Sequence, residues 1–237
     1  MQQLKLGNID IEVEQKDIKN IHLSVYPPHG KVRIAAPQKM DMDSIRVFAI
    51  SKLQWIKNQQ KELLEQEREP EREFIERESH YFLGERYLLK IHYREASPKV
   101  ELDHKYIHLF IRPETSTKKR AEVLDNWYRS ELKKLVPELI TKWEKVIGVK
   151  SNDHGIKKMR TKWGTCNTEA KRIWLNLELA KKPKDCLEYI IVHELVHLLE
   201  RSHNNRFVKL MDTFMPKWRF HRDELNRLPY SHVDWGY

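Results

Sequence analysis

Alternating hydrophobic and polar residues near the start of the chain predict β-strands. The stretches IDIEV (9–13), IHLSV (21–25) and KVRIAAP (31–37) place apolar side chains at every second position. This two-residue period is typical of strands with one buried face. The segment PPHG, Pro27 to Gly30, predicts a turn. We therefore expect a small β-meander over residues 2–37.

A helical period follows, and then the alternation returns. Asp43 or Ser44 is suited to cap a helix whose apolar positions recur at helical spacing as far as Ile56. The charged stretch that continues this helix is interrupted by Pro70, which favours a solvated helix end and a connection. Residues 81–112 alternate again, so we expect a second hairpin there.

The second half of the chain begins with its longest helical pattern, over residues 117–147. Pro137 lies inside this pattern and should kink or divide the helix, because proline cannot donate its backbone hydrogen bond. Gly148 is expected to end this helix.

Two more alternating stretches, residues 157–166 and 172–179, predict strands joined by NTEAK. Another helix should begin near Pro183, since proline is favoured in the first turn. Its expected core stripe is Leu187, Ile190, Ile191, Leu195 and Leu198. We therefore predict an α+β fold.

Composition and charge narrow the choice of protein class. With 237 residues, 40% of them hydrophobic and 33% charged, the chain can bury a proper core. No repeat of about 20–50 residues recurs. We expect an N-terminal β-rich region with one helix over residues 1–112 and a C-terminal domain over residues 113–237. The net charge of +9 favours anionic partners such as nucleic acid, although no RNA-binding motif is present.

The termini and the cysteines point to a cytoplasmic protein. The N-terminus has no charged region followed by an apolar run, and no stretch is long and apolar enough to span a membrane, so no membrane association is expected. Cys166 and Cys186 form no CxxC pair, and we expect both to be buried, reduced thiols.

The stretch HELVHLLERSH, residues 193–203, carries the candidate chemistry. His193 and His197 lie four residues apart, so on a helix both imidazoles project from one face toward a common point. A tetrahedral zinc ion needs that convergence. Glu194 would then lie beside the metal, where its carboxylate can take a proton from the attacking water.

The third histidine, His203, follows six residues after His197. On a continued helix it would lie about 120° away and about 9 Å further on, so the helix must end around Glu200 or Arg201. Asn204 or Asn205 can then cap a further helix that stops at Pro216.

Three histidine ligands leave a fourth position of the zinc ion for water, as in catalytic sites. We therefore predict one Zn²⁺ per chain, with His193, His197 and His203 as ligands and Glu194 as the general base. Peptide hydrolysis is the natural reaction, and other acyl hydrolyses, such as deacylation, would use the same arrangement.

Longer stretches of the chain resemble a known family. The segments MRTKWGTC, RIWLNLEL and YIIVHELVHLLERSHNNRFVKLMDTFMP are similar to those of the YgjP-like metallopeptidase family, which is related to the SprT-like and WLM zinc proteases. The segments IHLSVYPPHGKVRIAAP, SKLQWI and FLGERYLLKI extend the resemblance over most of the chain. It implies a C-terminal zincin-like domain in which a strand beside the HExxH helix pairs with an extended substrate. RIWLNLEL, residues 172–179, is the candidate for that strand.

The chain departs from related sequences at two places. Residues 162–166 read Lys-Trp-Gly-Thr-Cys where the family commonly has Arg-Trp-Gly-Ser-Cys. Metzincin proteases with the same histidine spacing turn at a glycine, where this chain has Glu200. Glu200 therefore has two alternatives, a competing metal ligand or a residue outside the coordination sphere.

Several other residues are expected to have structural roles. We expect His154, His221 and His232 to be surface or hydrogen-bonded residues, and Trp163 and Trp174 to be core residues in preference to a substrate platform. Lys162 and Arg206 receive no catalytic assignment.

Two functions remain open from the sequence. The first is a zinc-dependent metallopeptidase acting on a peptide or protein. The second is a basic, zinc-organised module that binds nucleic acid or a protein partner, which includes a protease acting on DNA-bound proteins. The oligomeric state is not predicted.

Overall fold

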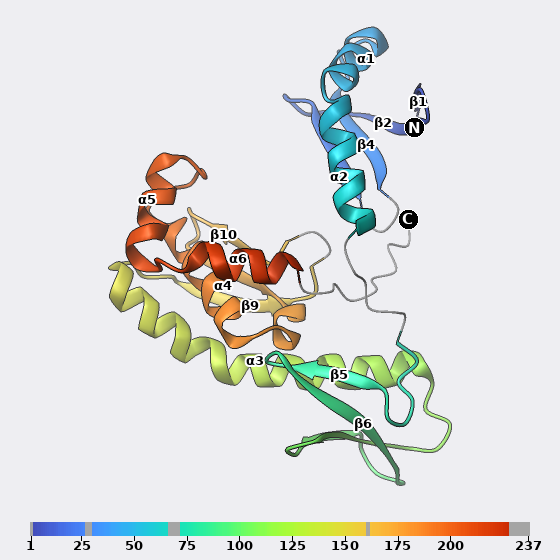
Figure 1. Ribbon diagram of the computed structural model, residues 1–237, viewed down its shortest axis with the longest axis vertical. Coiled ribbons are helices and arrows are strands. Elements are labelled where there is room, and N and C mark those ends of the chain that lie inside the picture. Colours follow the sequence, from blue (N-terminus) through green and yellow to red (C-terminus); the bar gives the residue numbers. More distant parts are fainter. Residues whose placement is uncertain (1, 27–29, 66–71, 160–161, 228–237) are drawn as a thin grey trace. The chain divides into compact units, whose positions relative to one another are not determined.

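Figure 1 shows the computed structural model, which describes residues 2–26, 30–65, 72–159 and 162–227. The described chain forms two compact units, one up to Glu65 and one from Arg72 to Arg227. The first unit contains one sheet and two helices, and the second contains two sheets and the remaining helices. The predicted α+β fold is confirmed.

Four strands form the sheet of the first unit: β1 (Gln2–Leu6), β2 (Ile9–Lys16), β3 (His22–Tyr26) and β4 (Lys31–Pro37). Their order is β1-β2-β4-β3, with β2 and β4 parallel and the two outer pairs antiparallel. The predicted meander is wrong in its order, because β4 lies between β2 and β3. Alternation fixes the buried face of a strand and leaves its neighbour undetermined. Most of the predicted turn from Pro27 to Gly30 lies outside the described residues.

Two helices complete the first unit, α1 (Met42–Ser51) and α2 (Leu53–Glu65). Asp41 caps α1, in place of Asp43 or Ser44, because its carboxylate accepts a hydrogen bond from the Ser44 backbone N–H at 2.7 Å. The predicted break at Pro70 lies outside the described residues. The helices and the sheet share a core made of Leu4, Ile9, Ile11, Val13, Val32, Ile34, Ala36, Ile45, Ala49 and Ile56.

The first sheet of the second unit contains β5 (Ser79–Phe82), β6 (Glu85–Tyr93), β7 (Lys99–Leu102) and β8 (Tyr106–Ile111). Its order is β5-β6-β8-β7, again with a parallel central pair and antiparallel outer pairs. The single hairpin predicted over residues 81–112 is therefore wrong, because two hairpins are joined through β6 and β8. This sheet repeats the topology of the first one, and Gly7 and Gly84 hold the first turn of each with φ of 62° and 88°.

The long helix α3 (Thr117–Ile147) follows the predicted pattern. Ser116 caps its start, and Gly148 ends it in the left-handed conformation with φ of 76°. Pro137 does not divide the helix, which runs unbroken through it and changes direction part-way along its length (Figure 1). Of the helices in the described part of the chain, none is both long and apolar enough to cross a membrane.

A third sheet contains β9 (Asp153–Lys157), β10 (Gly164–Asn167) and β11 (Arg172–Asn176). Its order is β10-β11-β9, with β11 antiparallel to β10 and parallel to β9. The strand predicted over residues 157–166 is therefore two strands, and residues 160 and 161 between them are not described. The strand predicted to reach residue 179 ends at Asn176, because the short 3-10 helix η1 (Leu177–Lys181) begins there.

The last helices are α4 (Lys184–Val196), α5 (Asn205–Phe214) and α6 (Trp218–Arg227). Pro183 precedes the first residue of α4, as predicted. The turn between β5 and β6 is fastened to this start, since the Leu83 N–H donates to the Ala180 carbonyl at 2.8 Å. A Cβ on Gly84 would lie 3.0 Å from Pro183 Cα, so only glycine fits this contact.

The β5–β8 sheet belongs with the helices that follow it. Its buried side chains form one continuous core with α3 and α4, which includes Leu89, Ile107, Leu109, Ile111, Leu124, Leu132, Leu187 and Ile191. The boundary expected between residues 112 and 113 therefore does not coincide with the division of the structure. The sheet has one apolar face, and within the described part of the second unit that face packs against elements from the C-terminal half.

Candidate metal centre

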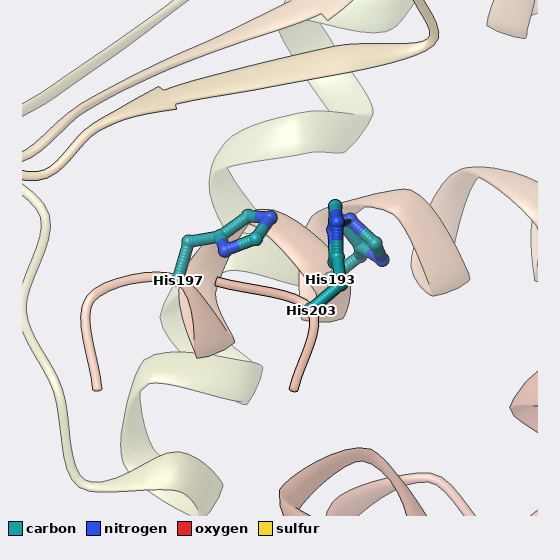
Figure 2. A group of neighbouring side chains, drawn as sticks. All are labelled: His193, His197 and His203. Carbon is teal, nitrogen blue, oxygen red and sulfur yellow. Dashed lines mark hydrogen bonds between the residues drawn. The ribbon is translucent and has the colours of Figure 1, made fainter. Parts of the chain in front are cut away.

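The three predicted histidine ligands come together at the end of α4. His193 lies in the last turn of this helix, His197 caps it, and His203 lies in the loop before α5. One nitrogen from each ring lies within 4.8 Å of the other two. Figure 2 shows the three imidazoles gathered around one point.

A tight turn brings His203 back toward the helix. Helix α4 ends at Val196, earlier than the predicted end near Glu200 or Arg201, and the next residues continue in a tighter turn. There the Leu199 N–H donates to the Val196 carbonyl, three residues back, at 2.9 Å. His197 Nδ1 then contacts the Glu200 carbonyl oxygen at 3.1 Å. Glu200 is not among the described residues with positive φ, so the turn needs no glycine.

Phe207 of α5 packs against all three imidazoles. Its ring centroid lies 4.9 Å from that of His193 and 4.8 Å from those of His197 and His203. Asn204 orients this helix start, since its side chain accepts a hydrogen bond from the Phe207 N–H at 3.1 Å. The predicted cap is confirmed, and the buried phenyl ring limits the movement of the three rings.

Burial favours the neutral form of His193 and His197. Burial, together with the neighbouring His197 and His203, lowers the pKa of His193 to about 3. Burial also lowers the pKa of His197, while its contact with the Glu200 carbonyl opposes that shift. Neutral imidazoles retain the lone pair that a metal ion requires.

The donor set fits a zinc ion. His193 Nε2 and His203 Nε2 are 2.9 Å apart, close to the roughly 3.3 Å expected between two nitrogens of a tetrahedral zinc site. If His197 Nδ1 donates its proton to the Glu200 carbonyl, its Nε2 is left for the ion. His193 Nδ1 is buried and makes no hydrogen bond within the described chain.

Glu200 does not join the group of metal-ligand atoms found among the described residues. Its Oε1 accepts a hydrogen bond from the Ser202 N–H at 3.2 Å, and its Oε2 lies 3.6 Å from Arg206 Nη1. Of the two alternatives for Glu200, the geometry favours the role outside the coordination sphere, in which it shapes the turn.

Glu194 is buried beside the histidines, with 5% of its surface exposed. This burial raises the pKa of its carboxyl group to about 8, and the positive charge of Lys162 opposes the shift. The side chain lies directly against strand β10, since a Cβ on Gly164 would lie 2.5 Å from Glu194 Oε1. Gly164 was not singled out from the sequence, although a glycine inside a strand often marks such a close approach.

A cleft of about 770 Å³ opens over the site. Its lining includes the three histidines, Glu194, strand β10 and part of α6. Strand β10 is the outer strand of its sheet and pairs only with β11 among the described strands. The expectation that residues 172–179 supply the substrate strand is wrong, because β11 already pairs on both sides with β10 and β9.

Asn176, which the sequence did not point to, holds the segment that leads into β10. Its amide nitrogen donates to the carbonyls of Met159 and Lys162 at 2.9 and 2.8 Å. Its carbonyl oxygen accepts from the backbone N–H groups of Met159 and Glu178 at 3.2 and 3.3 Å. All the hydrogen-bonding groups of this buried amide are used.

The expectations for the two tryptophans, the other histidines and the two cysteines are met only in part. Trp163 and Trp174 are half-buried and line the cleft, and Trp163 also packs against the core. His154 and His221 belong to no metal-ligand group, and His232 lies outside the described residues. Cys186 is buried as predicted, but Cys166 is only half-buried, and both are free thiols.

Comparison with known proteins places the chain in a family. A model of the YgjP-like metallopeptidase domain matches residues 19–228. The chain belongs to the YgjP-like metallopeptidase family. Membership in this family identifies the chain as a metallopeptidase, and therefore as a hydrolase. A comparison with curated proteins found no match.

Two crystal structures of metallopeptidase zymogens are similar to part of this YgjP-like chain. Abylysin of Pyrococcus abyssi shares 18% identity with a TM-score of 0.36, over 38% of this chain and 90% of that chain. Jannalysin of Methanocaldococcus jannaschii shares 20% identity with a TM-score of 0.35, over 38% of this chain and 92% of that chain.

The contact between Gly164 and Glu194 gives the first prediction. Gly164→Ala should lower the rate of casein hydrolysis by roughly tenfold or more, because the added Cβ displaces the carboxylate or the strand. The content of bound metal, measured by elemental analysis, should stay unchanged. Thr165→Ser on the same strand adds no atom and should keep the wild-type rate. Equal rates for wild type and Gly164→Ala would contradict this reading of the contact.

The amide of Asn176 gives a second prediction. Asn176→Asp should lower the free energy of unfolding by about 2–4 kcal/mol, because two buried carbonyls lose their donors and face a carboxylate. Denaturant titration measures the change. The control is Asn152→Asp, since exposed Asn152 donates one hydrogen bond at 3.2 Å and its loss should cost less than about 0.5 kcal/mol. Similar losses in both variants would rule out a special role for Asn176.

Proposed function

We propose that this chain is a zinc-dependent peptidase in which His193, His197 and His203 hold one ion and Glu194 is the general base. The observation that carries the proposal is the convergence of three imidazoles beside a buried carboxylate, in a cleft bordered by an edge strand. The family supports metal-dependent hydrolysis in general, and the donor set supports zinc.

In the proposed mechanism, a bound zinc ion and Glu194 have different roles. A bound zinc ion supplies a Lewis acid that lowers the pKa of a coordinated water to ~7 and polarises a carbonyl. Glu194 takes the proton of the attacking water and later delivers it to the leaving amine. Burial favours the protonated form that Glu194 holds between the two transfers, and the positive charge of a bound metal ion would favour the carboxylate that begins the reaction.

The shape of the cleft supports an extended peptide as substrate. Strand β10 leaves one edge unpaired among the described strands, and its residues line the cleft. A peptide that adds to this edge forms main-chain hydrogen bonds whatever its sequence. Gly164 then lies close to both the peptide and Glu194. A cytoplasmic location remains our prediction from the sequence.

The rival function, a zinc-organised module that binds nucleic acid or protein, uses the metal without hydrolysis. This function predicts that replacing Glu194 leaves the binding of nucleic acid or protein unchanged, because a structural zinc ion needs no general base. Substitution of Glu194 therefore distinguishes the two functions.

Glu194→Gln should keep one zinc per chain and reduce peptide hydrolysis by a factor on the order of 10³, because the amide fills the same space but cannot accept the proton. Cleavage of unfolded casein, followed by mass spectrometry, measures the loss. Glu200→Gln, a matched change outside the proposed ligand set, should keep both zinc and most of the activity. Undiminished cleavage by Glu194→Gln would exclude the proposed mechanism.

Removing a ligand should remove the metal. His193→Ala and His203→Ala should each lower the zinc content from about one ion per chain toward zero, since an open three-histidine site depends on every ligand. Elemental analysis after dialysis measures this, with His154→Ala as the control that keeps its zinc. Full zinc content in His203→Ala would show that another residue completes the site.

A further inference from the structure

The two four-stranded sheets share one topology, and their outward faces differ. In each sheet the alternate positions of the two central strands bury apolar side chains, so the positions between them form a second face. This repetition provides a comparison within one chain, because strand order and pairing are the same in both sheets.

In the first sheet, the second face carries charges of opposite sign in contact. Lys31 pairs with Glu12 at 2.7 Å, and Glu14 pairs with Lys16 at 3.0 Å and also with Arg33. Such a mosaic is typical of a solvated surface, on which the charges compensate each other.

In the β5–β8 sheet, the corresponding face of the two central strands is aromatic and basic, and the outer strand β7 adds the ion pair between Lys99 and Glu101. We define the aromatic face as Lys90 and His92 of β6 with Tyr106, His108 and Phe110 of β8. The β8 positions alternate with the buried Ile107, Leu109 and Ile111, and so point away from the core. His92 and Phe110 are opposite each other across the strands, with ring centroids 4.5 Å apart and planes 16° apart.

A chain of hydrogen bonds fixes these rings. His92 Nε2 lies 2.9 Å from His108 Nδ1, and His108 Nε2 lies 2.9 Å from Asp103 Oδ2. Asp103 Oδ1 in turn accepts the backbone N–H groups of Lys105 and Tyr106 at 2.8 and 2.7 Å. The rings of His92 and His108 and the backbone at Tyr106 are therefore held in place before any partner arrives, which lowers the entropy cost of binding.

Three cations lie over the rings of the aromatic face. Lys90 and Lys105 each place Nζ 5.4 Å from the centroid of Tyr106, and Arg94 places Cζ 5.0 Å from that of Phe110. None of the three forms an ion pair with a carboxylate of the described residues. Three acidic groups lie nearby. Asp103 contacts His108 of the aromatic face, Glu101 pairs with Lys99, and Glu76 accepts the backbone N–H of Ile91 at 2.8 Å.

We propose that the aromatic face binds single-stranded nucleic acid. Phosphates attract lysine and arginine side chains, and unpaired bases stack on aromatic rings in a way that tolerates any sequence. A duplex keeps its bases stacked inside, so it cannot use the rings. The net charge of +9 supports the attraction of a polyanion to the whole chain. This binding is independent of the proposed peptidase mechanism.

The test uses the full-length protein with labelled oligothymidylate and oligouridylate of about 12 nucleotides, a length within the usual range of single-strand sites. Fluorescence anisotropy at several salt concentrations gives the Kd and its salt dependence. The two oligonucleotides distinguish DNA from RNA as the source of the strand. Glu194→Gln protein should bind as the wild type does, which separates this proposal from the peptidase.

Two pairs of variants locate the site. Tyr106→Leu keeps an apolar side chain but removes the ring, and it should raise the Kd roughly tenfold. The control is Tyr93→Leu, which should leave the Kd unchanged, because Tyr93 is exposed and lies on the opposite side of its strand from the aromatic face. Lys90→Gln should reduce the slope of log Kd against log salt concentration by about 0.7, the value for one phosphate contact. Lys31→Gln on the first sheet should leave that slope unchanged. Thermal melting confirms that each variant is folded.

Three results would overturn the proposal. The first is that neither oligonucleotide binds at low salt. The second is binding that Tyr106→Leu and Lys90→Gln leave unaltered, which places the nucleic acid elsewhere on the chain. The third is a polyglutamate peptide that binds as tightly and depends equally on Tyr106 and Lys90, which would make the aromatic face a surface for acidic proteins.

Discussion

The candidate metal centre depends on the contact between His197 Nδ1 and the Glu200 carbonyl. This contact orients the ring of His197, a proposed ligand, and it joins the backbone hydrogen bonds to Val196 in closing the turn that returns His203. Continued as a helix, the same residues would carry His203 about 9 Å further on. The geometry of a three-histidine site is therefore a property of how one helix ends.

Around this turn, the site is held by groups that take no part in the proposed chemistry. Phe207 touches all three imidazoles, Gly164 allows β10 to lie against Glu194, and Asn176 fastens the segment that precedes β10. Each of these contacts joins a different element to the end of α4. The positions of the reacting groups are thus fixed by packing and by buried hydrogen bonds as well as by the turn that returns His203.

The sequence was most informative where a local rule decides the structure. Spacing placed His193 and Glu194 in the last turn of one helix with His197 directly after it, and the capping preference of asparagine pointed to Asn204 or Asn205, of which Asn204 is the cap. The same kind of rule failed for the sheets. Alternation identified most of the strands, but could not show that β4 lies between β2 and β3, because strand order depends on contacts distant in sequence.

The roles of Gly164 and Asn176 were hidden for a similar reason. Their importance comes from Glu194 and from the backbone at Met159 and Lys162, and no local pattern records those contacts. The division of the structure does not follow the boundary expected after residue 112, because elements on both sides of that residue share one core. Sequence spacing describes neighbours along the chain, whereas a core is defined by neighbours in space.

The β5–β6 turn is attached to the start of α4, and this attachment limits how short a fragment of the chain can be and still keep the candidate metal centre. Leu83 and Gly84 meet Ala180 and Pro183 where the chain enters the helix that carries His193. A fragment that began at residue 113 would lose this anchor and would expose the side of the core that the β5–β8 sheet covers. The smallest self-sufficient peptidase within this chain therefore includes the sheet as well as the helices.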